Sequence, residues 1–268
     1  MEIAQHFQRL ELHKVQALEA HTLRQVNVLL PSICLVRCGT KQLIWDASSI
    51  AIQAGQWVLL PKGMKFEVRN VPDNGRYLAQ VLSLTPALIE QFRVQQRAHL
   101  GEQPKLLCAR DLLVPHHAML AQTWEQLSRS LEDDTPQALQ EHHASGVLLA
   151  LSLLGKIAPL LLNRADPLSE RIQLLFALNP ARAWTTTMAA QSLHMGASTL
   201  RRHLHKEGCN FAQLLRETRL SHSLGLLQAT DTAIADIARA SGYASASRFS
   251  CRFRAHYGIA PSELRRTM

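Results

Sequence analysis

The residues most suited to chemistry in this sequence are arginines, serines and histidines in its last third. Two adjacent arginines follow Ser198, and a second polar and basic cluster surrounds Ser247. The fork of an arginine side chain matches both the edge of a guanine base and a phosphate. These residue types therefore favour binding to nucleic acid over catalysis.

Positive charge is concentrated in the same region. The chain of 268 residues carries a formal net charge of +8. Residues 181–268 hold 12 Lys and Arg against 5 Asp and Glu, whereas residues 1–180 hold 17 against 16. This asymmetry predicts a polyanion-binding module joined to a nearly neutral part. Charge alone leaves a solvated basic surface as the alternative.

The basic third contains an internal repeat. Residues 188–204 and 236–253 each fit a helix, a tight turn and a second helix, with a small alanine in the first helix. Gly196 and Gly242 stand where the chain must turn. In each second helix two apolar residues four apart form a buried face, which leaves a polar and basic face free to enter a major groove.

Hydroxyl side chains stand at the expected starts of these helices. Thr185 and Thr232 are predicted to cap the first helix of each unit, and Ser198 and Ser245 lie near the start of the second. Between the units, residues 211–228 predict a long connecting helix. A rigid connection permits both units to enter successive major-groove segments, about 34 Å apart.

A set of residues spread over the last third forms one pattern: Trp184-Thr185, Ala190, Ser198-x-Leu200-x-Arg202, Gly208-x-x-Phe211, Arg219-Leu220, Leu226-Leu227, Ile234-x-x-Ile237-Ala238, Gly242-Tyr243, Ser247-x-Phe249, Phe253 and Tyr257 to Arg265. Through this pattern the last third resembles the DNA-binding domain of the AraC/XylS family of bacterial regulators. Leu204 stands where the family usually has phenylalanine.

The resemblance implies DNA contacts in both units. The predicted DNA-binding residues are Ser198, Thr199, Arg201, Arg202 and His205 in the first unit, and Ser245, Ala246, Ser247, Arg248, Ser250, Cys251 and Arg252 in the second. Ala246 and Cys251 form few hydrogen bonds. The second unit is therefore expected to contribute more to phosphate binding, and Arg201 and Arg202 to carry most of the base specificity.

Short strands separated by turn residues are predicted over residues 25–84, which indicates an antiparallel barrel or sandwich. The spacing of Gly55, Pro61, Gly63, Phe66 and Asn70 resembles the second cupin motif. Metal-binding cupins carry histidine at the Phe66 position, and residues 25–84 contain no histidine. Neither a metal site nor another cofactor is expected.

AraC-type regulators often hold an effector inside this barrel. By that resemblance Trp45, Trp57, Phe66 and Tyr77 are candidates to line an effector pocket, with ordinary core packing as the alternative. A protein effector is equally compatible with the sequence.

Helices are predicted over residues 113–131 and 137–162. Val147 to Leu154 is apolar nearly all round, which indicates burial within the domain or against a second subunit. We therefore expect these helices to form a homodimer interface. The fold class is α+β: a cupin-like antiparallel β-barrel over residues 1–100, a helical dimerisation segment over 101–165, and an all-α double helix-turn-helix domain over 166–268.

The remaining chemistry-bearing residues do not indicate a site. The five cysteines are irregularly spaced, which favours reduced thiols, and the histidine pairs at 116–117 and 142–143 diverge on helices. No apolar run reaches the roughly 18 residues that a membrane span requires. The polar N-terminus does not resemble a signal peptide.

Together these features predict a cytoplasmic, sequence-specific transcription regulator that is not an enzyme. The expected partners are double-stranded promoter DNA, RNA polymerase, a second copy of the chain and a small-molecule or protein effector, with no membrane. The family resemblance favours an activator. The alternatives are a metal-dependent cupin enzyme, which the missing ligands oppose, and a methyl-accepting DNA-repair regulator, for which Cys34 and Cys38 form too small a cysteine cluster.

Overall fold

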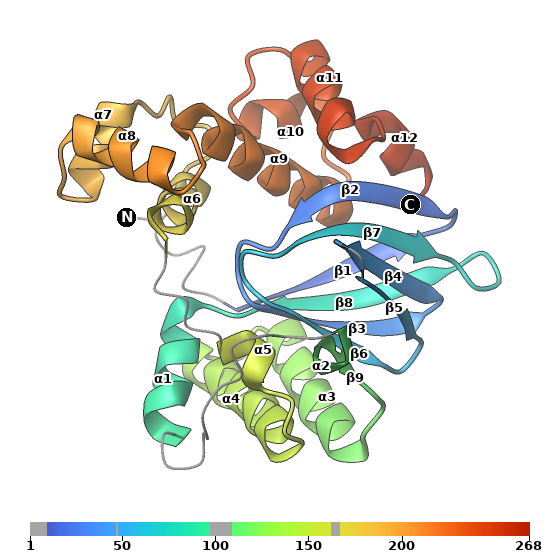
Figure 1. Cartoon of the computed structure of the whole chain (residues 1–268). Helices are drawn as coiled ribbons and strands as arrows, with labels where there is room; N and C mark the ends of the chain where they lie inside the picture. Colours follow the sequence, from blue (N-terminus) through green and yellow to red (C-terminus); the bar gives the residue numbers. More distant parts are fainter. Residues whose placement is uncertain (1–9, 47, 97–108, 162–166) are drawn as a thin grey trace.

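The structure is a computed structural model that describes residues 10–46, 48–96, 109–161 and 167–268. Antiparallel strands occupy the N-terminal part and helices the rest (Figure 1). The strands are β1 (Glu11–Ala17), β2 (His21–Asn27), β3 (Ser32–Cys38), β4 (Thr40–Trp45), β5 (Ser48–Gln53), β6 (Trp57–Leu60), β7 (Lys65–Val71), β8 (Tyr77–Ser83) and β9 (Leu113–Val114).

Helices follow the strands along the chain. They are α1 (Pro86–Gln96), α2 (Ala109–Leu112), α3 (Ala118–Glu132), α4 (Gln137–Leu153), α5 (Ala158–Leu161), α6 (Leu168–Leu178), α7 (Thr186–Ser192), α8 (Ala197–Lys206), α9 (Phe211–Ala229), α10 (Ile234–Ala240), α11 (Ala246–Tyr257) and α12 (Pro261–Arg266). None of the described helices combines the length and the apolar character that crossing a bilayer demands.

The strands form two antiparallel sheets. One has the order β1-β8-β3-β6-β9 and the other the order β2-β7-β4-β5. Between the described strands of the two sheets no ladder closes a barrel, but the arrangement is compatible with a cupin-like jelly roll. The predicted α+β class is confirmed.

The strand prediction needs correction at its N-terminal end. The predicted strand region begins near residue 25, whereas β1 and most of β2 precede that position. In β1, Val15 and Ala17 point inward while Lys14 and Gln16 are exposed, as expected for a half-buried strand. The strand pairs with β8 along its whole length, so it completes the edge of the five-stranded sheet.

The predicted helices of the middle segment are shorter than expected. The helix predicted over 113–131 begins at Ala118, because Leu113 and Val114 pair with β6 as β9. The helix predicted over 137–162 ends at Leu153. Gly155 follows with a φ of +65°, a left-handed conformation that favours glycine after a helix. Most of the predicted linker, residues 163–167, lies outside the described residues.

Buried apolar residues form three clusters. The first lies within the jelly roll and continues into α9, α10, α11 and α12. The second joins the five-stranded sheet to α1, α3, α4 and α5, which lie on the opposite side of the strands from the C-terminal helices (Figure 1). The third holds α6, α7, α8 and the start of α9 together, and none of its described members comes from a sheet. The C-terminal third therefore has two separate cores.

Candidate nucleic-acid interface

The first helix-turn-helix unit consists of α7 and α8. The hydroxyl oxygen of Thr185 accepts a hydrogen bond from the backbone N–H of Met188 at 3.2 Å, so the predicted cap of α7 is confirmed. Ala190 is 1% exposed, which fits a close helix crossing. In the turn, His194 rather than glycine adopts a positive φ, of +55°, and Gly196 is the extended residue before α8.

The two faces of α8 differ as the sequence predicts. Leu200 and Leu204 are buried. The predicted contact residues lie on the outside: Ser198, Arg201, Arg202 and His205 are exposed and Thr199 is half-buried. Ser198 lies inside the helix rather than at its cap position, so its exposed hydroxyl can face a partner outside the helix.

A carboxylate fixes the end of α8 against α6. Glu207 accepts hydrogen bonds from the backbone N–H groups of Leu168 and Ser169, both at 2.8 Å. Burial raises the pKa of Glu207, but these hydrogen bonds outweigh it and hold the pKa below its ordinary value. Glu207 thus remains ionised and satisfies the first turn of α6.

The second unit consists of α10 and α11. The hydroxyl of Ser245 accepts from the backbone N–H of Arg248 at 3.3 Å, so this side chain caps α11. The predicted cap at Thr232 is wrong: Ala233 occupies the cap position of α10 and offers no side-chain oxygen. The helix starts one residue later than the sequence suggested.

Phe249 and Phe253 form the buried face of α11. The predicted contact residues of this unit lie on its outside: Ser245, Ala246, Ser247, Arg248, Cys251 and Arg252 are exposed, and Ser250 is half-buried. As the sequence suggests, the exposed surface offers arginines and serines but little hydrogen bonding from Ala246 or Cys251.

Arg219 of α9 joins the two units. Its guanidinium donates to the carbonyl of Pro180 at 2.9 Å and to that of Arg182 at 3.0 Å, both in the segment before α7. Gly242, in the turn of the second unit, has a φ of +79°, and a Cβ there would lie 2.7 Å from both the Pro180 oxygen and Arg219. Only glycine fits, and the relative placement of the units is fixed by this contact.

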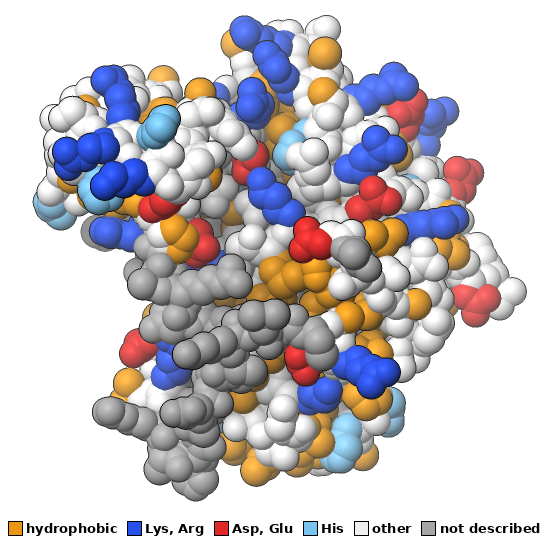
Figure 2. Space-filling view, in the orientation of Figure 1, with side chains coloured by type: hydrophobic (Ala, Val, Ile, Leu, Met, Phe, Trp, Pro, Cys, Tyr) orange, Lys and Arg blue, Asp and Glu red, His pale blue; other side chains and the backbone are white. Residues whose placement is uncertain are grey.

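Basic side chains gather over these helices. Figure 2 shows Lys and Arg over the part of the surface where the C-terminal helices lie in Figure 1. Lys206 and Arg254 are exposed and were absent from the predicted set. Lys206 follows Arg202 by four residues and Arg254 follows Ser247 by seven, so helical spacing alone could have found them.

The structure does not bring the four effector-pocket candidates together. Phe66 and Tyr77 are buried in the first cluster, and the Trp45 ring packs edge-on against Phe66 with centroids 5.4 Å apart. Trp57 belongs to the second cluster, on the helical side of the sheet, with its ring 6.0 Å from that of His116. Trp57 therefore cannot line a pocket with the other three.

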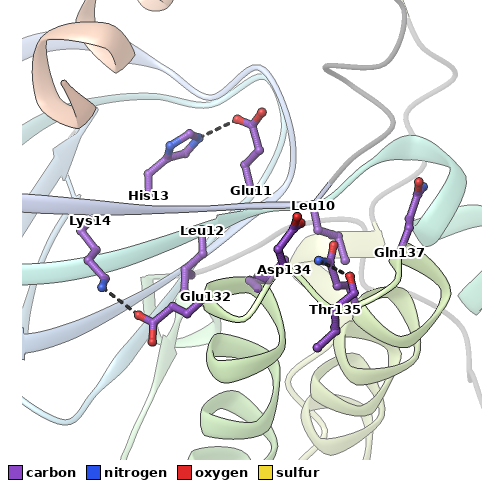
Figure 3. Close-up of a pocket in the computed structure, with 11 residues that line it drawn as sticks. Leu10, Glu11, Leu12, His13, Lys14, Glu132, Asp134, Thr135 and Gln137 are labelled. Carbon is purple, nitrogen blue, oxygen red and sulfur yellow. Dashed lines mark hydrogen bonds and ion pairs between the residues drawn. The ribbon is translucent and has the colours of Figure 1, made fainter. Parts of the chain in front are cut away.

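An open cleft of about 410 Å³ lies elsewhere in the N-terminal part, between β1 and the connection from α3 to α4 (Figure 3). Lys14 and Glu132 form an ion pair at 2.7 Å, and His13 lies 3.1 Å from Glu11. The hydrogen bond and the charge of Lys14 lower the pKa of Glu132. No sequence pattern indicates this cleft, because it depends on a strand and a loop far apart in the chain.

The residues of the cupin motif do not form a metal-binding set. Phe66 is 2% exposed and occupies the position where metal-binding cupins carry histidine. Within the described ranges, no three His, Cys, Asp or Glu side chains are grouped so that they could hold a metal ion. Cys108 lies outside the described residues.

Comparison with known sequences gives related regulators. Residues 189–267 match a family described as "Helix-turn-helix domain". The chain is 32% identical over 187 residues to the "HTH-type transcriptional regulator GadX" of Escherichia coli O127:H6, a match that spans 68% of this chain and 66% of that relative. It is 32% identical over 103 residues to the "Urease operon transcriptional activator" of Escherichia coli, covering 38% of this chain and 35% of the relative.

Comparison with solved structures supports the fold of the whole chain. The crystal structure of unsaturated fatty acid bound ToxT from Vibrio cholerae matches with a TM-score of 0.66 and 18% identity. The match covers 97% of this chain and 96% of that one. The two-sheet N-terminal part and the C-terminal helices thus follow one common architecture.

Proposed function

This chain belongs to the AraC/XylS family of transcription regulators, and on that premise we propose that it binds promoter DNA sequence-specifically and activates transcription. The proposal covers the whole protein, whereas the match spans 66% of the length of the related GadX. Such a protein works at the chromosome in the cytoplasm, where contact with RNA polymerase completes the activator role.

One observation carries this proposal. In each of the two helix-turn-helix units a hydroxyl caps one helix, and the second helix buries one face and exposes a basic one; Arg219 fixes the units relative to each other. Such an arrangement supports insertion of α8 and α11 into successive major-groove segments. The paired arginines of α8 support base reading by the first unit, and the plainer face of α11 supports docking on phosphates.

Replacing Arg202 by alanine is expected to weaken binding to the specific operator by about 1–3 kcal/mol, because an arginine that reads a base loses a bidentate contact. The operator is first found by mapping bound sites across the genome. Affinity is then measured for operator and random DNA. Arg129→Ala, an exposed arginine on α3, is the matched control and should leave both affinities unchanged. Equal losses on operator and random DNA would reassign Arg202 to a phosphate.

We further propose that the protein is not an enzyme. Phe66 in place of a ligand histidine opposes the cupin enzyme, and stoichiometric iron or manganese in the purified protein would revive that alternative. The methyl-accepting regulator needs a reactive thiol. Cys38 is half-buried and its thiol donates to the carbonyl of Arg76 at 3.3 Å. Unchanged promoter responses in Cys38→Ser would close this alternative.

Homodimerisation through the helical segment is the third part of the proposal. On α4, Leu139, Leu149 and Leu153 are 42%, 40% and 70% exposed, and together with Gly146 they lie along one side of the helix. A Cβ on Gly146 would meet no other described atom within 4 Å, so this position leaves room for a second helix. An exposed apolar stripe of this spacing suits a helix of a second copy.

Replacing Leu153 by aspartate is expected to raise the dimer dissociation constant about a hundredfold or more, because each dimer would lose two buried leucines. Sedimentation equilibrium measures this constant. Ile44→Asp, at an exposed apolar residue of β4 in the four-stranded sheet, is the matched control. An unchanged dissociation constant in Leu153→Asp would place the dimer interface elsewhere.

The N-terminal part is proposed to receive the effector, a small molecule or a protein. The related fold of ToxT was solved with an unsaturated fatty acid bound, which supports the small-molecule case. Trp45, Phe66 and Tyr77 are the remaining candidates from the predicted set, and the cleft beside β1 is the candidate that the structure adds. The division at residues 100 and 165 is retained as part of this proposal.

A further inference from the structure

The second helix-turn-helix unit rests directly on the strands. Helix α9 contacts β1 and β2, helix α11 contacts β2, and both helices share the first buried cluster with these strands (Figure 1). At the end of α12, the carbonyl of Thr267 accepts from the backbone N–H groups of Leu18 and Glu19, at 2.6 and 3.2 Å. The turn between β1 and β2 thus binds the last turn of the DNA-binding part.

A network of hydrogen bonds between buried side chains supports this contact from inside the sheet. The ammonium group of Lys41 donates to Asn70 Oδ1 at 2.9 Å, and Asn70 Nδ2 lies 3.2 Å from His21 Nε2. His21 Nδ1 lies 3.1 Å from the hydroxyl of Thr267, which itself donates to the carbonyl of Leu264 at 2.8 Å. Lys41, Asn70, His21 and Thr267 are each at most 9% exposed.

The geometry permits one protonation state of His21. Since Asn70 Oδ1 faces the lysine donor, the amide presents its N–H₂ group to His21, so Nε2 must accept. The Thr267 hydroxyl has already donated its hydrogen to Leu264, so it must accept from Nδ1–H. The carbonyl of Glu19, 3.4 Å from Nδ1, also favours a hydrogen there. A neutral imidazole with its hydrogen on Nδ1 satisfies these neighbours.

Protonation of His21 disrupts this hydrogen-bond network. A hydrogen on Nε2 would face the amide N–H₂ group, so two donors would meet. Rotating the Asn70 amide by 180° would instead place the N–H₂ group against the Lys41 ammonium, which also only donates. Burial lowers the pKa of Lys41, and acid favours its ammonium form, so acid holds the amide in place under the conditions that protonate His21. An unmatched buried donor is costly.

The surroundings of His21 act in the same direction. Burial lowers the pKa of His21, the carbonyl of Glu19 raises it, and the charge of Lys41 lowers it further. Lys41 of β4 is the charged group that faces His21; β7 and α12 present the neutral Asn70 and Thr267. The pKa therefore lies below the ordinary value of 6.5.

A second histidine lies at the same interface. His256 of α11 is half-buried, and burial lowers its pKa. Glu217 of α9 and the carbonyl of Gln25 of β2 raise it, whereas Lys65 of β7 and Arg216 of α9 lower it. This residue is therefore removed in one arm of the experiment below.

We propose that the contact of α12 with the β1–β2 turn is a latch that protonation of His21 opens, which frees the second helix-turn-helix unit from the N-terminal part. The pKa of His21 is lowered while α12 is docked on the β1–β2 turn. His21 therefore binds a proton more tightly when α12 is undocked. The latch is therefore fully stable above the free pKa of about 6.5 and weakens as the pH falls below it. This latch rests on the proposed function, because it would let the N-terminal part control DNA binding by the second unit. Its test needs no DNA.

Hydrogen–deuterium exchange of the full-length protein tests the latch. The amides of Leu18 and Glu19 donate to Thr267, so their protection, corrected for intrinsic exchange rates, reports the docked state. From about pH 7.5 to about pH 5.5 we expect the protection to fall about tenfold, the limit for a single proton that binds only the undocked state. The decrease should persist in His256→Gln.

Lys41→Met is the decisive variant. Without the lysine the Asn70 amide is free to rotate and accept from protonated His21, so the protection should no longer fall with pH. His13→Gln, which removes a histidine of the cleft beside β1, is the control and should behave as the unaltered protein. Constant protection in the unaltered protein, or an equal decrease in Lys41→Met, would overturn the proposal. Either result leaves DNA binding untouched, so failure of the latch and failure of the proposed function are distinguishable.

Discussion

Raising the salt concentration from about 50 to about 200 mM is expected to weaken the complex with operator DNA roughly a hundredfold. Each cation that neutralises a phosphate releases a counterion, and about four such contacts give a loss of this size. The candidates are the exposed cations of α8 and α11 outside the proposed base-reading pair: Lys206, Arg248, Arg252 and Arg254. Fluorescence anisotropy of labelled operator across a salt series provides the measurement.

The slope of the logarithm of affinity against the logarithm of salt concentration also shows which side chains bind phosphates. Lys206→Ala and Arg254→Ala should each lower the slope by about one if these cations bind phosphates. Arg129→Ala on α3 should leave the slope unchanged. An affinity that varies less than about tenfold over this range would contradict the electrostatic basis of binding.

Replacing Phe253 by alanine is expected to lower the free energy of unfolding by about 3–5 kcal/mol. The side chain is fully buried, and its ring lies 5.5 Å from that of Phe249 and 4.6 Å from that of Tyr257. Since the same cluster contains strand residues, the loss should reach beyond the second unit. Urea denaturation followed by circular dichroism measures the total effect.

Tryptophan fluorescence tests how far that loss extends. The four tryptophans of the chain, Trp45, Trp57, Trp124 and Trp184, all lie outside the second unit. A shared core predicts that Phe253→Ala lowers the fluorescence midpoint together with the circular dichroism midpoint. Arg252→Ala, an exposed neighbour, should change the unfolding free energy by less than about 0.5 kcal/mol. A fluorescence midpoint that stays fixed in Phe253→Ala would show that the jelly roll is stable independently of α11.

The sequence predicts the helix-turn-helix units well because their signals are local. The four-residue spacing of Leu200 and Leu204, and of Phe249 and Phe253, places each helix and its buried face. The cap at Thr185 is also a local signal. Thr232 fails as a cap because a shift of one residue moves its hydroxyl out of reach, and local patterns do not fix helix ends that finely.

The features that depend on long-range pairing were not predictable. β1 has a polar sequence, and only its pairing with β8 identifies it as a strand. Leu113 and Val114 fit a helical pattern until β6 pairs with them. Trp57 lies on β6 of the five-stranded sheet and faces its helices, whereas Trp45 lies on β4 of the other sheet; the family resemblance that groups them does not specify strand register. The contact between His21 and Thr267 joins opposite ends of the chain, which no spacing rule anticipates.

The separate core of the first unit affects how the sequences of the two units can evolve. Within the part of the chain that the structure describes, the buried residues beneath α8 belong to a cluster without strand residues. Substitutions in the first unit can therefore change the preferred operator during evolution without requiring changes in the N-terminal part. The second unit lacks this freedom, since α11 and α12 must keep matching β2 and the turn before it. Among related chains that bind different operators, the sequence differences should therefore lie mainly in α8. Where α11 differs between such chains, β2 should differ as well.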